Sequence, residues 1–491
     1  MSKNKVAVIG SGFAGLSAAT CLAKGGKNVH VYEKNDQIGG RARQFSAEGF
    51  VFDMGPSWYW MPDVFERYFE RFGHNPRDFY ELKLLDPSFT MVFGQDDVMN
   101  IPANFDDLCA LFEETEKGAA DKLRKFMKEA AYKYDKGIND LVYKPGLSIF
   151  EFADPSIMKD VFRLQLFSNF SKHVRSYFKH PKLIALMEFP VLFLGAMPEQ
   201  TPALYSLMNY AGLKLGTWYP MGGFHQIIKG MEKVALEAGV QIHTSSPISQ
   251  LNVSNKNIDS IQLNGNAIDV DTVVASADYN HVEKDLLQKK YRNYSEKYWA
   301  SRTFAPSSLL FYLGVNKKVP RLEHHTLFFD HGLQQHSEDI YINKQWPEKP
   351  LFYVCCPSKT DPSVAPIGQE NLFLLMPIAP GLEDGEALRE KYFELMMTRL
   401  EKYVGEDLRN SIVYKRSYCV SDFIQDYNAY QGNAYGLANT LMQTAILKPS
   451  IKSKKVNNLY FSGQLTVPGP GVPPSLISGQ VVADQILKQT S

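Results

Sequence analysis

The apolar positions near the start of the chain change from a continuous run to a helical spacing and then back to a run. Val6-Ala7-Val8-Ile9 is a short, mostly β-branched run that predicts a buried strand. Apolar residues then recur at helical spacing as far as Gly25-Gly26, and Val29-His30-Val31-Tyr32 predicts a second strand. The order strand, helix, strand predicts a βαβ unit with parallel strands.

The two periods continue to alternate along the rest of the chain. Helical spacing predicts helices within residues 104–131, 156–182, 227–234, 388–403 and 475–487. Short apolar runs predict strands within residues 241–243, 247–253, 270–277, 307–314, 351–356, 372–378, 412–420 and 458–461. Asn264-Gly265 predicts a turn. The strands after residue 300 predict a second lobe with an antiparallel-rich sheet and helices on one face.

A glycine-rich turn joins the first strand to the first helix. In Gly10-Ser11-Gly12-Phe13-Ala14-Gly15, Gly10 permits a tight turn, Gly12 lets a pyrophosphate approach the backbone, and Gly15 lets the helix pack on the strand. The N-terminus of the helix attracts phosphate charge. Glu33 ends the second strand, where a carboxylate accepts hydrogen bonds from an adenosine ribose and disfavours a 2′-phosphate. The sequence therefore predicts a site for NAD or FAD and not for NADP.

Composition limits the class of protein. A chain of 491 residues is long enough for two or three lobes, and its 53 basic and 53 acidic residues give no indication of nucleic acid as a partner. The five cysteines show no C-x-x-C spacing, and no signal-peptide pattern precedes the first strand. The longest apolar run, residues 189–197, is too short to cross a bilayer. We therefore expect a reduced, cytoplasmic protein that is neither secreted nor membrane-spanning.

The segment 156–182 combines an apolar stripe with a basic flank. Such a helix can lie on an anionic membrane surface, with its basic side chains reaching the phosphates. It can equally pack its stripe on the core and leave a solvated basic edge, and the pattern alone leaves both interpretations open. The stripe consists of Phe167, Phe170, Val174, Tyr177 and Phe178, and the flank of Lys172, Arg175 and Lys179.

The residues after Glu33 carry a family resemblance. Gly39-Gly40-Arg41-Ala42-Arg43 and Phe52-Asp53-Met54-Gly55-Pro56 resemble the extended N-terminal signature of two-dinucleotide-binding flavoproteins. With further matching segments at 57–62, 218–223, 305–308, 361–368 and 459–478, the whole chain is similar to the bacterial-type phytoene desaturase family of carotenoid desaturases. The C-terminal pattern of that family is kept at Gly463, Pro468, Gly469, Gly471, Val472 and Ser478, and this chain departs from it at Gln464, Leu465, Val467 and Pro474.

The resemblance implies FAD as the cofactor and an α/β fold in three parts. These are a discontinuous Rossmann-like FAD-binding domain (1–75, 215–282 and 445–491), a substrate domain with a mixed or antiparallel sheet (76–110 and 283–444), and a helical membrane-associating region (111–214). The C-terminal helix would point its N-terminus at the flavin. The cofactor-binding residues that the resemblance implies are Gly10, Gly12, Phe13, Ala14, Gly15, Glu33, Lys34, Gly39, Gly40, Arg41, Ala42, Gly55, Pro56, Ser57, Ile248, Gly463, Gln464, Gly471 and Val472.

The implied activity is removal of a hydride and a proton from a C40 polyene, either phytoene or a 1-hydroxycarotenoid, to form a carbon–carbon double bond. Flavin N5 accepts the hydride and the developing allylic cation is delocalised, so no strong base is essential. No pair of carboxylates or histidines has a diagnostic spacing. The candidates for catalysis are Asp53, Arg41, Tyr59 and His225, each with a structural role as the alternative.

Two further motifs leave alternatives open or are set aside. Trp58-Tyr59-Trp60 can line a tunnel for a polyene or belong to the core. The adjacent histidines His324-His325 are candidate metal ligands. We nevertheless expect no metal site, because no further ligand lies at a suitable spacing in the sequence.

The resemblance also implies partners. A C40 polyene resides in a bilayer, so we expect peripheral association of the protein with the inner face of the cell membrane, with oxygen or a quinone as electron acceptor. Flavin amine oxidases and protoporphyrinogen oxidases share the N-terminal unit, but they do not usually carry the loop Pro468-Gly469-Pro470-Gly471. Flavin-free prenyl-lipid carriers of the GDP-dissociation-inhibitor type do not need the intact glycines, Glu33 and Gly463 together.

Overall fold

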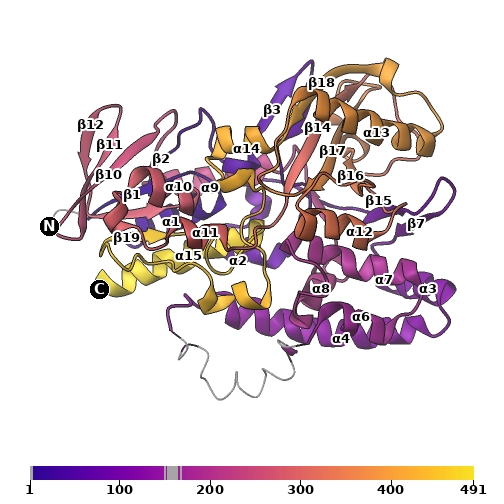
Figure 1. Ribbon diagram of the computed structural model, residues 1–491, viewed down its shortest axis with the longest axis horizontal. Coiled ribbons are helices and arrows are strands. Elements are labelled where there is room, and N and C mark those ends of the chain that lie inside the picture. The colour runs from indigo at the N-terminus through magenta and orange to yellow at the C-terminus, as the bar shows by residue number, and fades with distance from the viewer. Residues whose placement is uncertain (1–3, 149–150, 152–163, 166–167, 491) are drawn as a thin grey trace.

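The computed structural model describes residues 4–148, 151, 164–165 and 168–490. Its first layer is a five-stranded parallel sheet (Figure 1). The strand order is β19-β13-β1-β2-β9. Segments from the start, middle and end of the chain therefore meet in one sheet, on the left of Figure 1. Its strands are β1 (Lys5–Ile9), β2 (Asn28–Tyr32), β9 (Gln241–His243), β13 (Thr272–Ala275) and β19 (Leu459–Phe461).

Helices α1 (Phe13–Lys24) and α15 (Val472–Thr490) cross at close range on this sheet. The Ser17 hydroxyl donates to the Leu476 carbonyl oxygen (2.8 Å). A Cβ at Gly479 would lie 2.3 Å from the Ala14 carbonyl oxygen, so a side chain at this position would separate the helices. The C-terminal helix is thus fixed against the helix that follows the glycine turn.

The C-terminal helix begins earlier than the sequence predicts. The pattern predicts a start at Ser475, whereas α15 starts at Val472 and includes Pro473 and Pro474. Prolines fit a first helical turn because its N–H groups have no partner within the helix, and their fixed φ suits helical geometry. The two prolines therefore belong to the helix and not to the loop before it.

A three-stranded antiparallel sheet extends from the parallel sheet. It contains β10 (Ile248–Ser254), β11 (Asn257–Leu263) and β12 (Asn266–Asp269). The predicted turn at Asn264-Gly265 is confirmed, with φ of 50° and 81°. Strands β11 and β12 on either side of it are additional to the predicted ones. Helix α9 (His225–Glu237) precedes this sheet and confirms the predicted amphipathic helix.

The second lobe is built on a seven-stranded sheet in the order β18-β14-β17-β16-β15-β6-β7. Only β15 and β6 pair in parallel, so the sheet is mixed but mostly antiparallel, as the sequence predicts. Helix α13 (Glu386–Val404) packs on one face, where the Phe393 ring lies 5.1 Å from that of Phe311. The strands are β6 (Phe89–Val92), β7 (Val98–Ile101), β14 (Ser307–Val315), β15 (His325–Phe328), β16 (Phe352–Cys355), β17 (Glu370–Ile378) and β18 (Ile412–Tyr418).

Helices lie below this sheet at the lower right of Figure 1. The predicted helix 104–131 is two helices, because Gly118 between them has a φ of +78°. Those helices are α3 (Phe105–Thr115), α4 (Ala119–Lys136), α6 (Phe170–Tyr177), α7 (Pro181–Glu188) and α8 (Leu207–Leu213).

The apolar stripe of α6 faces the protein core and not solvent. Phe170, Val174 and Phe178 are fully buried, and the Phe178 ring lies 5.3 Å from that of Phe112 on α3. Of the two interpretations of this pattern, the core-facing helix is the one observed, with Lys172, Arg175 and Lys179 at its exposed edge. Phe167 lies outside the described residues. The membrane-associating role of residues 111–214 stays a prediction. The division of the chain into three domains also stays a prediction.

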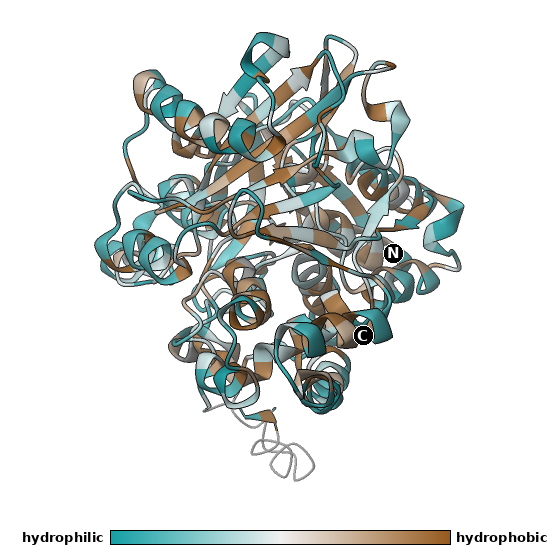
Figure 2. Ribbon diagram, turned by 90° about the vertical axis from the view of Figure 1, so that its right-hand side faces the viewer, coloured by the Kyte–Doolittle hydropathy of each residue, from teal (hydrophilic) through white to brown (hydrophobic). Residues whose placement is uncertain are grey.

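Hydrophobic residues gather on the strands and on the inward faces of the helices (Figure 2). Among the described residues, no helix has the length and apolarity needed to cross a membrane. Besides short 3-10 and π-helical segments, which include the π-helix η9 (Asp339–Asn343), the described residues form β3 (Gln44–Ala47), β4 (Phe50–Asp53), β5 (Leu82–Leu84), β8 (Trp218–Pro220), α2 (Pro62–Glu70), α10 (Tyr279–His281), α11 (Glu296–Ala300), α12 (Leu333–Glu338) and α14 (Val420–Tyr427).

Candidate functional site

A cavity of about 670 Å³ extends from the carboxyl ends of β1 and β2 to the face of the seven-stranded sheet. Ligands of parallel α/β sheets bind at the carboxyl ends of the strands. All the residues that the sequence implies for cofactor binding line this cavity, except Gly15. The structure therefore brings together residues from 10–57, 248 and 463–472 that are distant in the sequence.

The glycine turn has the geometry of a phosphate loop. Gly10 has a φ of +98°, which favours glycine. A Cβ at Gly12 would meet no atom within 4 Å, so the backbone there is open to a ligand. A Cβ at Gly15 would lie 2.0 Å from the Gly10 carbonyl oxygen, so Gly15 acts by packing and does not line the cavity.

Glu33 is held in place at the end of β2. Its Oε2 accepts hydrogen bonds from the Ser11 N–H (3.0 Å) and the Ser11 hydroxyl (2.7 Å), and its Oε1 accepts from the Asn35 N–H (2.9 Å). A carboxylate oxygen has more than one acceptor position, so Glu33 can also accept from a ribose hydroxyl. Beside it, Lys34 Nζ donates to the Gln425 carbonyl oxygen (2.6 Å), and burial lowers the Lys34 pKa.

Arg41, which is half-buried, places a positive charge in the lining of the cavity. Its Nη2 donates to the Asn433 carbonyl oxygen (3.0 Å), and its guanidinium lies 4.9 Å from the Tyr427 ring centre. Burial lowers the Arg41 pKa, while Tyr427 and Asp278 act in the opposite direction. The Arg41 Nε has no hydrogen-bond partner. A buried guanidinium with an unpaired N–H suits an anionic or electron-rich ligand.

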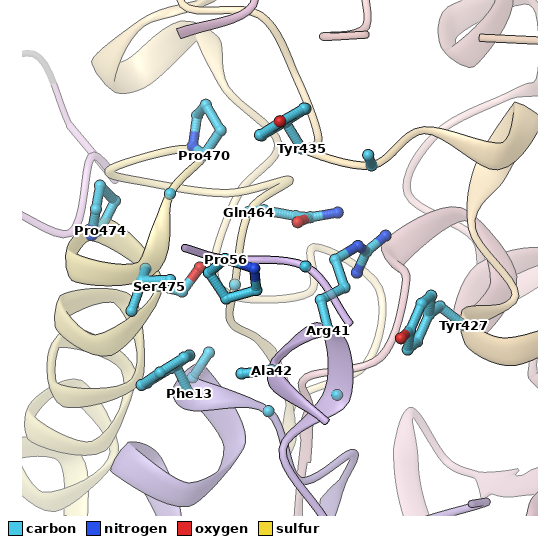
Figure 3. Close-up of a pocket in the computed structure, with 18 of the residues that line it drawn as sticks. Phe13, Arg41, Ala42, Pro56, Tyr427, Tyr435, Gln464, Pro470, Pro474 and Ser475 are labelled. Atoms are coloured by element: carbon cyan, nitrogen blue, oxygen red, sulfur yellow. The ribbon is translucent and has the colours of Figure 1, made fainter. Parts of the chain in front are cut away.

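The C-terminal loop closes the cavity opposite Arg41 (Figure 3). Gln464 lies between Arg41 and Tyr435, and with its amide oxygen toward Arg41 it accepts from Nη2 at 3.0 Å. At the start of α15, Ser475 N–H donates to the Gly471 carbonyl oxygen (3.0 Å), and the two preceding prolines have no N–H. Val472 therefore supplies the remaining N–H of this first turn, so the predicted attraction of the helix N-terminus for the flavin depends mainly on one donor.

Beyond this loop the cavity continues as an apolar arm. Trp58 and Trp60 line it, whereas Tyr59 is buried in the core. The triplet is therefore divided between the cavity and the core, and a role in binding a polyene stays a prediction. Other apolar residues of the arm include Ile138, Val142, Phe189, Leu192, Leu207 and Met208.

The sequence profile of the family described as flavin containing amine oxidoreductase matches residues 13–487. The chain belongs to this flavin-containing amine oxidoreductase family. A carotenoid 3,4-desaturase from Haloarcula japonica is 42% identical over 489 residues, which are 99% of each chain. A zeta-carotene-forming phytoene desaturase from Myxococcus xanthus is 29% identical over 98% of this chain and 94% of its own. Within the family, the chain thus lies among the carotenoid desaturases.

Solved structures of other proteins share the fold of this chain. An oxidoreductase from Methanosarcina mazei superposes with a TM-score of 0.62 at 17% identity, over 98% of this chain and 100% of its own. At this level of identity the likeness shows the fold alone. The flavin-containing family and its carotenoid desaturase members establish the protein as an oxidoreductase with FAD as its cofactor.

The cavity of this flavin-containing oxidoreductase fits FAD. The open backbone at Gly12 and the carboxylate of Glu33 suit the pyrophosphate and the ribose. The unpaired Arg41 Nε and the loop from Gly463 to Val472 lie farther along the cavity, toward the apolar arm. We expect the flavin ring there, and the exact contacts of each residue stay predictions.

Three of the four candidates for catalysis do not line the cavity, and their contacts account for them as structural residues. The Asp53 carboxylate accepts from the N–H groups of Phe224 (2.7 Å) and His225 (3.3 Å), which fixes the start of α9. Burial raises the Asp53 pKa to about 6. Tyr59 exchanges a hydrogen bond with the Tyr80 hydroxyl (3.0 Å) and is fully buried.

His225 likewise has a structural position. Its Nδ1 lies 2.9 Å from the Ala42 carbonyl oxygen, and burial lowers its pKa. It supports the backbone next to Arg41 from behind. Arg41 is the one candidate that lines the cavity, and its permanent charge suits binding better than proton transfer.

The histidine pair has a neighbour that its sequence spacing does not show. His325 pairs with Cys355 across β15 and β16, and ligand atoms of His324, His325 and Cys355 all lie within 4.8 Å of one another. Burial lowers the pKa of His324 to about 3 and that of His325 well below its usual value. The argument that no third ligand accompanies the pair was wrong, because sheet pairing supplies one.

Some cavity residues have no signal in the motifs. Asp278 follows β13, and the rule that ligands bind at the carboxyl ends of parallel strands could have identified it. Tyr427 ends α14, and Tyr435 belongs to the connection after that helix. This connection folds back on the cofactor region, where Asn433 accepts a hydrogen bond from Arg41. Nothing in their spacing indicates this return.

Proposed function

We propose that the protein is a carotenoid desaturase that acts at or near the C3–C4 bond of its substrate. The observation that supports this most is one continuous cavity, in which an apolar arm follows directly on the residues expected around the flavin. An apolar arm suits a hydrocarbon chain, and its continuity with the cofactor site allows direct hydride transfer. The 42% identity to a carotenoid 3,4-desaturase supports the position of the reacting bond.

The chemistry divides between cofactor and protein. Bound FAD accepts the hydride that leaves one carbon of the polyene. The neighbouring carbon loses a proton, and the electron pair of that C–H bond forms the new double bond. Among the cavity residues of the described chain, the carboxylates are Glu33, Asp278 and Asp426, which lie near the dinucleotide site and not on the apolar arm. The proton therefore passes to a water molecule within the cavity, and the protein acts by placing the chain against the flavin while excluding bulk solvent.

Each double bond leaves two electrons on FAD, which an acceptor must remove. We propose a membrane quinone or molecular oxygen for this step, because both are available where the substrate resides. Turnover with an added quinone under argon would identify the quinone, and turnover only in air would identify oxygen.

We further propose peripheral association with the inner face of the cell membrane. Four exposed apolar side chains form what we call the docking patch. They are Leu147 (41% exposed), Met442 (73%), Ile446 (38%) and Leu447 (45%). A Cβ at Gly146 would lie 3.5 Å from the Ala445 carbonyl oxygen, so the two segments of the patch are neighbours. The same Cβ would lie 3.2 Å from Val467, next to the cavity residue Pro468. An exposed apolar patch near the cavity suits uptake of a lipid-dissolved polyene.

Anaerobic mixing of the flavoprotein with carotenoids in liposomes tests the proposal. Loss of the oxidised flavin spectrum, together with a product that lacks two hydrogens and absorbs at longer wavelength, supports desaturation. A flavin that amines reduce and carotenoids do not would instead assign the protein to the amine oxidases of its family.

A further inference from the structure

Two polar side chains interrupt the apolar arm near the seven-stranded sheet. His336, on α12, and Tyr341, on η9, both line the cavity. The His336 Nε2 and the Tyr341 hydroxyl are buried and have no hydrogen-bond partner. Their neighbours in the lining include the apolar Leu327, Phe329, Ile340 and Leu351. Buried polar groups nearly always have partners, so two unpaired ones at the same cavity indicate a ligand group that completes them.

The hydrogen-bonding role of His336 follows from its other ring nitrogen. The Leu351 N–H donates to Nδ1 (3.2 Å), so Nδ1 is an acceptor and carries no proton. Burial lowers the His336 pKa to about 4, so the ring is neutral at pH 7. A neutral ring with a bare Nδ1 carries its proton on Nε2. His336 is therefore a donor, and the group that it lacks is an acceptor such as an oxygen.

The two residues come from consecutive helical segments of different geometry. Helix α12 continues directly into η9, a π-helix. Residues five apart are hydrogen-bonded neighbours in a π-helix, whereas an α-helix would turn them to different sides. Tyr341 lies within the widened turns and His336 just before them, and both side chains line the same cavity. Such π-helical segments are frequent at functional sites.

Both groups line the cavity that also contains the residues expected around the flavin. Tyr435 lines the cavity beside Gln464 and Pro470 (Figure 3). The pKa of Tyr341 is raised by burial and, in addition, by the nearby Tyr435 hydroxyl. A polar group bound by Tyr341 would therefore lie near the reacting bond. That arrangement suits a bond at the end of a polyene and not one in the middle of the chain.

We propose that His336 and Tyr341 bind a hydroxyl group on the end of the polyene and thereby set which bond lies against the flavin. The His336 Nε2–H donates to the hydroxyl oxygen, and the Tyr341 hydroxyl accepts from it or donates to it. This inference rests on the proposed desaturase function and selects a hydroxylated carotenoid as its substrate. A substrate without the oxygen leaves both protein groups unpaired, which is a strong basis for discrimination.

The test compares an acyclic C40 polyene that bears a hydroxyl at C1 with the same polyene without it. For the wild-type holoenzyme, we expect kcat/KM to favour the hydroxylated polyene by roughly a hundredfold. Tyr341→Phe and His336→Leu should each reduce this ratio by roughly tenfold, through loss on the hydroxylated substrate alone. His336→Gln keeps both an acceptor for Leu351 and a donor, so it should retain most of the preference.

Tyr392→Phe is the matched control, because the Tyr392 hydroxyl donates to the Pro347 carbonyl oxygen outside the cavity. It should leave the ratio unchanged, and FAD content and Tm verify that each variant is folded. A wild-type preference for the polyene without hydroxyl, or an unchanged ratio in folded Tyr341→Phe, would overturn this inference. Failure of the wild type to oxidise either polyene would instead contradict the desaturase function itself.

Discussion

Gly12 offers a direct test of the dinucleotide site at the scale of a single residue. A side chain at this position meets no protein atom within 4 Å and would enter the cavity instead. We therefore expect Gly12→Leu to lose FAD almost completely and to fold with a Tm close to that of the FAD-free wild type, since bound FAD itself stabilises the folded state. The ratio of flavin absorbance to protein absorbance after gel filtration measures this.

Gly385→Leu is a suitable control for this variant. A Cβ at Gly385 also meets no atom within 4 Å, but the residue caps α13 far from the cavity. This control should retain FAD. If Gly12→Leu also retains FAD fully, the glycine turn is not the phosphate-binding loop.

The buried side chain of Lys448 should make the stability of the protein depend on pH. Its Nζ is buried without a partner, and burial lowers its pKa from the ordinary 10.5 to about 7. Between these two values the unfolded chain binds more protons than the folded one, so this residue makes stability rise with pH from about 7 to 10.5. Below pH 7 both states are protonated, and the cost of burying the charge is fully present.

Lys448→Met should therefore raise the free energy of unfolding by about 1–3 kcal/mol near pH 7. Denaturant unfolding of both proteins between pH 6 and pH 10 measures the difference. We expect it to be largest at the acidic end and to shrink as the pH rises. A difference that grows with pH would show that Lys448 is stabilised in its charged form.

Sequence reasoning at this scale was strongest where backbone geometry restricts the residue. Gly10, Gly12 and Glu33 lie where their motif predicts because turn geometry and strand ends determine their positions. Asp53 and His225 were named for their chemistry, but Asp53 accepts from backbone N–H groups at the start of α9, and His225 bonds to the Ala42 carbonyl oxygen next to Arg41. A residue type alone does not reveal which side of a loop it faces.

At the scale of elements, the docking patch gives a test of membrane association. Met442, Ile446 and Leu447 are exposed and close to the cavity, whereas the apolar stripe of α6 is buried. Changing these three residues to Ser should lower co-sedimentation with liposomes of mixed neutral and anionic lipids by roughly tenfold, because less apolar area enters the interface.

The basic flank of α6 provides the comparison. Lys172, Arg175 and Lys179 changed together to Glu should reduce only the salt-sensitive part of the binding. Wild-type co-sedimentation by the Ser variant would rule out the docking patch as the membrane contact. No binding of the wild type itself would contradict peripheral association.

Element prediction succeeded where periodicity was long and failed where it was short. Strands β14, β16, β17 and β18 and helix α13 carry apolar patterns and occur as predicted, whereas the short strands β6, β7 and β15 of the same sheet were not predicted. Strands β11 and β12 mix polar and apolar residues on an edge sheet, so their pattern resembles that of a loop. The stripe of α6 was ambiguous because a membrane and a protein core select the same apolar face.

At the scale of the whole molecule, function depends on segments that sequence order separates. Three parts of the chain build the parallel sheet, and the end of α14 and the connection after it supply Tyr427 and Asn433 beside Arg41. The family resemblance indicated FAD and a polyene, since motifs around the cofactor are local. The course of the apolar arm was not predictable, because it arises where the helices below the second sheet meet its face.

The most direct test of the account is a single-turnover spectrum of the purified holoprotein. Under anaerobic conditions, a carotenoid in liposomes should reduce one FAD for each new double bond, as the polyene spectrum shifts to longer wavelength. Mass spectrometry should show loss of two hydrogens, and NMR should place the new bond at or near C3–C4. A flavin that stays oxidised with every carotenoid offered, in a protein that retains FAD and binds liposomes, would contradict the account.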